Sequence, residues 1–265
     1  MKGFERAIAS GRHFALTRYG DGEAAILQGR EISTGPTNRH WCWRPSQEIG
    51  TAIFSSDLNR AFECDAPNYY IGISCPCCGP ADYDYYRDRL NHTRLHTRTT
   101  YANIFSNGNW RYFNERIIET SSATRRQLVL VTNWNKNFTL ARRLLPSNAV
   151  EVVPVCEAAY EQPIADRAGE GDYYGGAVLW YCCSRDTVQA QFRTIASSFR
   201  DAIFLVQLGP VANILIHQMF LRNRENTYLD MGHSLDGILF GDPSRAFHSG
   251  EPWAMCDDMD ISWDL

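Results

Sequence analysis

The stretch Arg18-Tyr19-Gly20-Asp21-Gly22-Glu23 places two carboxylates one residue apart in a turn that contains two glycines. The preceding residues, Phe14 to Tyr19, alternate like a partly buried strand, and Glu23 to Gln28 has the pattern of a short helix that ends before Gly29. We therefore expect the acidic pair at a loop tip between a strand and a helix. In open α/β sheets, such tips at the carboxyl ends of strands are where ligands bind.

The two acids of this turn carry the oxygen ligands that hard divalent cations prefer. We predict that Asp21 and Glu23 hold Mn²⁺ or Mg²⁺, with water or phosphate oxygens completing the shell. A structural alternative also fits the same residues, because an Asp-Gly turn can be followed by a Glu that caps a helix. The spacing alone allows both.

A second alternative for this turn is a loose dinucleotide fingerprint, Gly20-x-Gly22-x-x-Ala25, in which glycines let a pyrophosphate approach backbone amides. Two observations count against it. Asp21 and Glu23 would repel a bare pyrophosphate, and no ribose-binding acid stands about 20 residues on, between Asn38 and Gln47. A diphosphate bridged by a metal ion avoids the repulsion.

The rest of the chain alternates between strand and helix patterns. Strands are predicted at 68–73, 127–132, 150–155, 202–208 and 228–231, with helices at about 137–145 and from Gly209-Pro210 onward, where proline occupies its tolerated first helical position. This alternation predicts an α/β fold with a doubly wound, mostly parallel sheet. We treat residues 1–265 as one domain, with an acidic tail at 251–265.

Composition limits the function classes. The chain has 265 residues, 44% of them hydrophobic, and a formal charge of -4, so no global field attracts it to nucleic acid or to anionic membranes. Charges at Lys2, Glu5 and Arg6 interrupt any signal core, and no apolar run reaches the roughly 20 residues of a membrane helix. We expect a cytoplasmic protein without a membrane partner.

The cysteines allow two interpretations. There are nine, an odd number, and several stand in apolar runs where thiols pack as small hydrophobes. Cys75-Pro76-Cys77-Cys78 has CxxC spacing, and Cys182-Cys183 could complete a four-thiolate zinc site. Because no second CxxC or histidine pair stands at ligand spacing, cysteines buried near strand ends are the favoured interpretation.

The segment from Arg87 to Arg126 differs from its surroundings, with eight arginines against three acids and interleaved aromatic residues. Arginine forks grip phosphate and aromatic rings stack on bases, so this apparent insertion could hold a nucleotide or a nucleic-acid strand. The alternative is a solvated helical face rich in arginine.

The opening motif resembles the DxE motif of the glycosyltransferases with the GT-D fold, the group known as DUF1792. Three further stretches resemble that family in the same order: Leu128-Val129-Leu130-Val131 followed by Asn135-Lys136-Asn137-Phe138, then Leu208 to Leu215, and Leu229-Asp230-Met231-Gly232-His233. The resemblance covers residues 14 to 236. It implies a Rossmann-like GT-D fold and transfer of a sugar from a nucleotide diphosphate, typically a UDP-sugar.

The resemblance assigns Asp21 and Glu23 to the metal and to the donor diphosphate. We also expect Arg18, Gly20, Gly22, Asn135 and Gly209 to bind the donor, because arginine neutralises charge and glycine-led helix starts aim amides at phosphate. The acceptor hydroxyl must lose a proton to a base, and we nominate Asp236 or His233. Both residues also have structural interpretations, as a cap and as a hydrogen-bonded histidine.

Three functional classes remain open from the sequence. The first is the metal-dependent glycosyltransferase, whose acceptor is a glycan, a protein, a small molecule or a hydroxymethylated base in viral DNA. The second is an NAD(P)- or FAD-linked oxidoreductase that uses the Gly20 turn. The third is a non-enzymatic nucleic-acid-binding protein that uses the arginine-rich segment.

Overall fold

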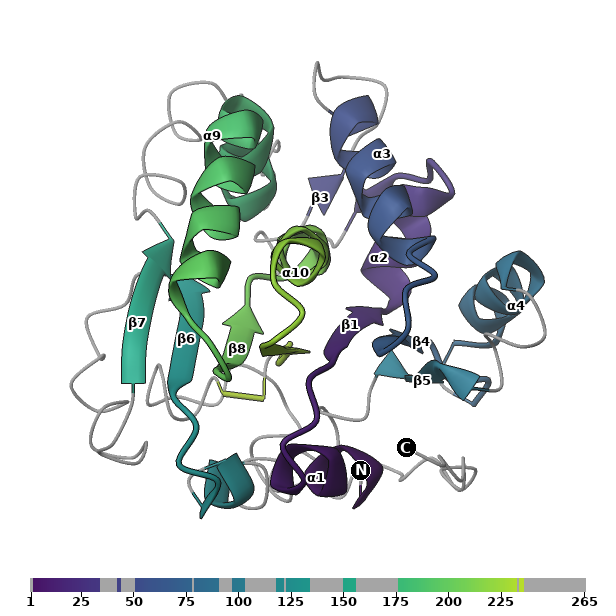
Figure 1. The fold of residues 1–265 in the computed structure, drawn as a ribbon. Coiled ribbons are helices and arrows are strands. Elements are labelled where there is room, and N and C mark those ends of the chain that lie inside the picture. Colours follow the sequence, from purple (N-terminus) through teal and green to yellow (C-terminus); the bar gives the residue numbers. More distant parts are fainter. Residues whose placement is uncertain are drawn as a thin grey trace.

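The computed structural model describes residues 2–33, 42–43, 51–77, 79–90, 97–102, 118–121, 123–133, 150–155, 176–232 and 234–235. Seven strands form one sheet in the order β5-β4-β1-β9-β8-β6-β7, and every pairing in it is parallel (Figure 1). The strands are β1 (Ala15–Tyr19), β4 (Tyr69–Ile73), β5 (Thr99–Tyr101), β6 (Leu128–Asn133), β7 (Val150–Val155), β8 (Ile203–Gln207) and β9 (Thr227–Asp230). Two-residue strands β2 (Ile32–Ser33) and β3 (Cys42–Trp43) form a separate antiparallel pair.

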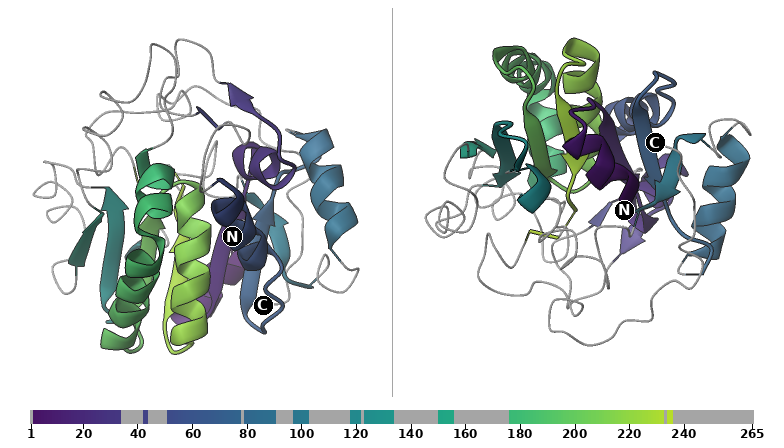
Figure 2. Two further views of the ribbon diagram at one scale, coloured as in Figure 1. Left: turned by 90° about the horizontal axis from the view of Figure 1, so that it is seen from above. Right: turned by 60° about the horizontal axis from the view of Figure 1, so that its bottom comes forward.

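Helices connect the strands. They are α1 (Lys2–Ala9), α2 (Asp21–Leu27), α3 (Thr51–Phe62), α4 (Pro80–Arg89), α9 (Gly176–Ser198) and α10 (Pro210–Arg222). Helices α3, α9 and α10 lie along one face of the sheet, and Figure 2 shows α9 and α10 running side by side. Helix α1 covers the other face through Phe4, Ala7 and Ile8. The predicted α/β class with a parallel sheet covered on both faces is confirmed.

Successive residues of the strands enter opposite cores, as the two-residue period of a strand requires. Val129 and Val131 of β6 belong to the core beneath α9 and α10, whereas Leu128 and Leu130 belong to the core beneath α1. Both sets are at most 2% exposed. This double burial explains why the predicted strand reads as a continuous apolar run.

Strands β1 and β9 are neighbours in the sheet although they lie far apart in the sequence. The direction of the connections changes between β8 and β6, because the chain passes from β6 to β7 on one side and from β8 to β9 on the other. The crevice at such a switch point lies outside the carboxyl ends of the strands and is where open α/β sheets bind ligands.

The predicted elements are confirmed with small shifts at their ends. All five strands predicted beyond the opening turn are present within two residues of the expected bounds, and α10 begins at Pro210 as predicted. The helix expected at 137–145 and the acidic tail at 251–265 lie outside the described residues. The opening turn needs a correction, because α2 begins at Asp21 rather than at Glu23, so both acids stand in the first helical turn instead of at a loop tip.

Part of the arginine-rich segment belongs to the sheet, because β5 pairs with β4 in parallel. Four of its arginines form ion pairs with acids: Arg87 with Asp84 and Asp88, Arg89 with Glu63, Arg98 with Asp65, and Arg126 with Asp201. These four charges are therefore balanced within the protein. Arg94, Arg111 and Arg116 lie outside the described residues.

No helix in the described part of the chain combines the length and the apolar character that a bilayer-spanning segment needs.

Candidate functional site at the carboxyl edge of the sheet

The main chain at the end of β1 is held by a buried amide from the facing helix. The register pairs β1 with β9 at Ala15 and Leu16, and beyond this point Asn213 of α10 takes over. Its Oδ1 accepts the Arg18 N–H at 3.0 Å, and its Nδ2 donates to the Arg18 carbonyl at 2.8 Å. Asn213 is fully buried, so these bonds fix the point where β1 and β9 separate.

The side chain of Arg18 extends between the segment that follows β5 and the segment that follows β9. Its Nε donates to the carbonyl of Ala102, just after β5, and its guanidinium lies against Gly232, just after β9. A Cβ at Gly232 would stand 1.6 Å from Arg18 Nη1, and Gly232 has a φ of +53°, so only glycine suits this position. Burial lowers the pKa of Arg18, and the charges of Asp230 and Glu23 oppose that shift.

Asp230 ends β9 beside this guanidinium and is only 4% exposed. Its Oδ1 accepts the Gly232 N–H at 3.0 Å, which shapes the turn after the strand. Asp230 and Gly232 stand in a stretch that carries the family resemblance, but the sequence assigned them no role. Their only local signal is an acid at the end of a predicted strand, followed by a glycine.

Glu23 folds back onto the start of its own helix. Its Oε2 accepts the Gly20 N–H at 2.9 Å, which is the capping interaction that the structural alternative expected. The pKa of Glu23 is raised to about 7, mainly by burial and also by the negative charges of Asp230 and Asp21, against the lowering effect of the backbone hydrogen bonds. Three carboxylates therefore influence one another at this edge.

Asp21 is the first residue of α2 and is exposed, with Gly22 beside it in the same turn. Asp82 of α4 lies close enough that the charge of Asp21 raises its pKa, although burial is the larger cause of the increase. Asp82 is paired with Arg30 at 2.9 Å. Nothing local in the sequence pointed to Asp82, because packing rather than chain proximity brings α4 to this edge.

Tyr86 of α4 contacts the start of α2 at Gly20. Its hydroxyl donates to the Gly20 carbonyl at 2.7 Å, and its fully buried ring packs against Tyr19 and Phe62. Burial, followed by the charge of Glu23, raises the pKa of Tyr86 well above its ordinary value. Tyr86 therefore stays a neutral donor, and nothing local in the sequence identified it.

The two glycines that precede α2 and α10, Gly20 and Gly209, differ in backbone conformation and in the space around them. Gly20 has a φ of -90°, which other residues adopt, and a Cβ there would make only ordinary contact with Glu23 at 3.5 Å. Gly209 precedes α10 with a φ of +53°, and no atom lies within 4 Å of a Cβ built on it. Gly209 thus leaves open space at the carboxyl end of β8. Asn135, His233 and Asp236 lie outside the described residues.

A divalent cation at this edge would find few protein ligands. Within the described residues, no group of three or more His, Cys, Asp or Glu side chains has an arrangement that could hold a metal ion. Asp21 and Glu23 are the two carboxylates in the first turn of α2, and Mg²⁺ is commonly bound by one or two carboxylates with phosphate and water oxygens for the rest. The clustered negative charge around Glu23 favours such a cation.

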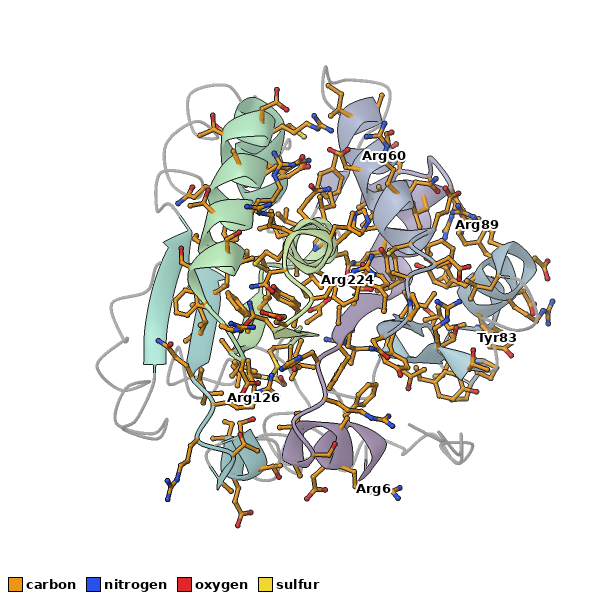
Figure 3. All side chains as sticks on the ribbon, viewed as in Figure 1. Arg6, Arg60, Tyr83, Arg89, Arg126 and Arg224 are labelled. Atoms are coloured by element: carbon orange, nitrogen blue, oxygen red, sulfur yellow. The ribbon has the colours of Figure 1, made fainter. Side chains whose placement is uncertain are left out.

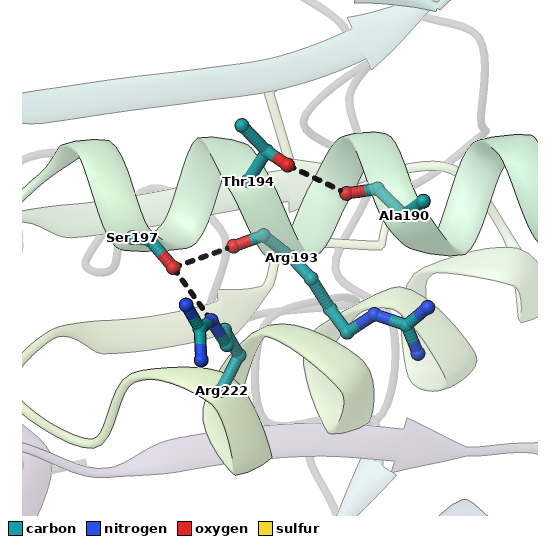
Figure 4. Close-up of a pocket in the computed structure, with 5 residues that line it drawn as sticks. All are labelled: Ala190, Arg193, Thr194, Ser197 and Arg222. Carbon is teal, nitrogen blue, oxygen red and sulfur yellow. Dashed lines mark hydrogen bonds between the residues drawn. The ribbon is translucent and has the colours of Figure 1, made fainter.

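Two surface hollows lie away from this edge. One, of about 420 Å³, lies between α9 and α10 and is lined by Ala190, Arg193, Thr194, Ser197 and Arg222 (Figure 4). Its hydroxyls donate to backbone carbonyls of α9, and Arg222 donates to Ser197 at 2.8 Å. The other, of about 360 Å³, adjoins the ion pair of Asp57 with Arg185.

No family model matches the sequence, and no curated protein matches it. Two solved structures do resemble the fold. This chain is similar to structures of DUF1792. One is a selenomethionine-substituted structure of the domain of unknown function 1792, and the other describes that domain as having a distinct glycosyltransferase fold. For each, the identity is 14%, the match covers 87% of this chain and 76% of the other, and the TM-score is 0.48. The similarity concerns the fold and assigns no role to any residue.

Proposed function

We propose that this protein is a glycosyltransferase that moves a sugar from a nucleotide diphosphate, most simply a UDP-hexose, to an acceptor hydroxyl. The observation that carries the proposal is the cluster of Arg18, Asp21, Glu23 and Asp230 at the carboxyl ends of the neighbouring strands β1 and β9. The charges of Asp230 and Glu23 act on Arg18, and Asp21 acts on Glu23. A net negative charge at a ligand-binding edge suits a metal-bridged polyanion rather than a bare one.

The proposed donor site divides the work among these residues. Asp21 and Glu23 would hold Mn²⁺ or Mg²⁺, which when bound acts as a Lewis acid on the departing diphosphate. Arg18 adds positive charge at the same edge. Its guanidinium is positioned there by the hydrogen bond to the Ala102 carbonyl and by the contact with Gly232. Gly22 and the open position at Gly209 would let the donor approach the backbone.

Two of the proposed roles stay predictions from the sequence. Asn135 is proposed to contact the donor, and His233 or Asp236 is proposed to take the proton from the acceptor hydroxyl. A glycan, a protein and a hydroxymethylated base in viral DNA are the proposed acceptors.

The oxidoreductase alternative is the weaker one. A dinucleotide would need the Gly20 amide for its pyrophosphate, and Glu23 already occupies that amide. The nucleic-acid alternative is weakened because four of the arginines it would use for phosphate already form ion pairs with acids of the protein. These are Arg87, Arg89, Arg98 and Arg126.

The test is a donor and acceptor screen read by mass spectrometry. The protein is incubated with Mn²⁺, a panel of UDP-sugars, and either an oligosaccharide mixture or hydroxymethylated DNA. We expect one acceptor to gain the mass of one sugar, and we expect EDTA to abolish the gain. A complete panel without any gain in mass, from a protein that binds none of the donors, contradicts the proposal.

A further inference from the structure

Cys75 and Cys77 lie in the loop that leaves the carboxyl end of β4. Their Sγ atoms are 3.1 Å apart, and neither is in a disulfide. Cys75 is 2% exposed, whereas Cys77 is exposed to solvent. The Cys77 thiol can therefore react with a reagent in solution, whereas the Cys75 thiol is buried next to it.

The loop backbone holds the two sulfurs together. The Gly79 N–H donates to the Cys75 carbonyl at 3.0 Å, and Pro76 between the cysteines fixes one backbone angle. Gly79 packs closely on the same loop, because a Cβ there would lie 3.5 Å from Ser74 Cβ. Since a disulfide has its sulfurs about 2 Å apart, closing the bond requires a movement of about 1 Å.

We propose that Cys75 and Cys77 form a redox-active dithiol that closes to an intramolecular disulfide by exchange with a small-molecule disulfide. The exposed Cys77 thiolate attacks one sulfur of oxidised glutathione, and the glutathione S–S bond breaks to release one glutathione thiolate. Cys75, after losing its proton to solvent, attacks Cys77 Sγ and expels the second glutathione. The two cysteines lose two electrons and two protons, and oxidised glutathione gains them.

The disulfide formed in this way is a reversible modification rather than a structural staple. It encloses only one residue, Pro76, so it removes little chain entropy from the unfolded state. Disulfides that are strained or exposed are the easily reduced ones, and here one sulfur faces solvent. We therefore expect a mild dithiol reductant to reopen the bond fully.

The proposal does not depend on the glycosyltransferase proposal. The loop does adjoin the candidate site, because β4 pairs with β1 up to Ile73 and Tyr19, and the loop leads into α4, which carries Tyr86. Oxidation is measured on the chain itself and needs no donor or acceptor.

The experiment exposes the full folded chain to oxidised glutathione, blocks the remaining thiols by alkylation, and reads the peptide that contains residues 75–78 by mass spectrometry. We expect this peptide to lose two hydrogen atoms, with fragmentation placing the bond between Cys75 and Cys77. Dithiothreitol should restore alkylation of both cysteines. Cys64→Ser is the control variant and should leave the result unchanged.

Two variants make the pairing specific. Cys77→Ser changes an exposed side chain and should abolish the loss of two hydrogens, whereas Cys78→Ser should leave it intact. Circular dichroism confirms that each variant is folded, and Cys77→Ser carries the test even where Cys75→Ser fails to fold. A bond that involves Cys78, a stable glutathione adduct on Cys77 without ring closure, or no reaction at all overturns the proposal.

Discussion

Each edge of the sheet carries one arginine among acids, and the two arginines have different surroundings. The carboxyl-edge cluster consists of Arg18, Asp21, Glu23 and Asp230, and the amino-edge cluster consists of Arg126, Asp201, His13 and Thr227. Strand β9 contributes to both, with Thr227 at its start and Asp230 at its end. Figure 3 labels Arg126 at the edge where β6 begins.

At the amino edge, the arginine is paired with an acid, although its Nη1 is buried without a hydrogen-bond partner among the described residues. Arg126, 5% exposed, forms an ion pair with Asp201 at 2.8 Å and also donates to the Ala202 carbonyl and to Thr227 Oγ1. His13 contacts the same carboxylate at 2.8 Å. These contacts tie the start of β9 to the segments before β6 and β8, which is a structural role.

At the carboxyl edge, three acids stand around one arginine of the cluster. The charges of Asp230 and Glu23 act on Arg18, and the pKa of Glu23 is raised to about 7, mainly by burial and also by the charges of Asp230 and Asp21. A protein gains no stability from carboxylates that repel one another, so such a cluster indicates a ligand that relieves the repulsion. The ion pair of Arg126 with Asp201 thus has a structural role, and the cluster of acids at the carboxyl edge is the candidate site.

The largest expected effect that distinguishes the two edges is the effect of a carboxyl-edge substitution on activity. Asp21→Asn should lower sugar transfer by about 10²-fold or more, because it removes a negative ligand of the proposed cation. Asp21 is exposed, so the free energy of unfolding should change by less than about 0.5 kcal/mol. Steady-state kinetics and urea unfolding measure the two quantities. Asp88→Asn, an exposed acid of α4, is the control and should keep full activity.

The next effect is on stability at the opposite edge. Arg126→Leu should lower the free energy of unfolding by about 3 kcal/mol, because it removes charged hydrogen bonds and leaves buried acceptors without a donor. Donor binding should be unchanged. Arg200→Leu, whose side chain is 81% exposed, should change the stability by less than about 0.5 kcal/mol. Equal losses in the two variants would remove the structural side of the contrast.

Gly232→Ala should destabilise the protein by about 2 kcal/mol, because its φ of +53° is strained for alanine and the new Cβ collides with the Arg18 guanidinium. Donor affinity should fall with it, since Arg18 is displaced. Thermal unfolding and donor titration check both effects. Gly11→Ala has the same strain at a φ of +72° but open space around it, so it should lose stability alone.

The smallest effect depends on pH. Glu23 has a pKa of about 7 in the fold against an ordinary value of 4.5, so the folded state binds a proton more tightly and stability is lost as pH rises through this window. Glu23→Gln keeps an oxygen for the Gly20 N–H and removes the charge. Without metal, it should stabilise the protein by about 1 kcal/mol at pH 8 and by nothing measurable at pH 4. Urea unfolding at both pH values tests this, and a loss of stability at pH 8 would contradict it.

The sequence was sufficient for the parts that depend on local order. The strand at 150–155 and the start of α10 at Pro210 were predicted within a residue, because apolar β-branched runs and a first-turn proline act locally. Asp21 and Glu23 were named for the same reason, and their role in binding a metal stays a prediction. The start of α2 was placed two residues late, since the glycines of the turn read as loop although Gly22 adopts the helix.

The remaining members of the carboxyl edge were not predicted, because only packing brings them together. Asn213 reaches the main chain of Arg18 from 195 positions away, and Tyr86 reaches Gly20 from 66 positions away. Asp230 stands at the end of a buried strand, where an acid is read as a strand boundary. The arginines at 89 and 98 seemed available for phosphate until the fold supplied their acidic partners.

The central claim is that the acids of the carboxyl-edge cluster bind a nucleotide diphosphate through a cation. Isothermal titration of UDP into the protein, with and without Mn²⁺, tests it most directly in the wild type, in Asp21→Asn and in Asp88→Asn. We predict that UDP binds only with Mn²⁺, that Asp21→Asn loses this binding, and that Asp88→Asn keeps it. Binding that is equal in Asp21→Asn and the wild type, or no binding of UDP with Mn²⁺ to the wild type, contradicts the account.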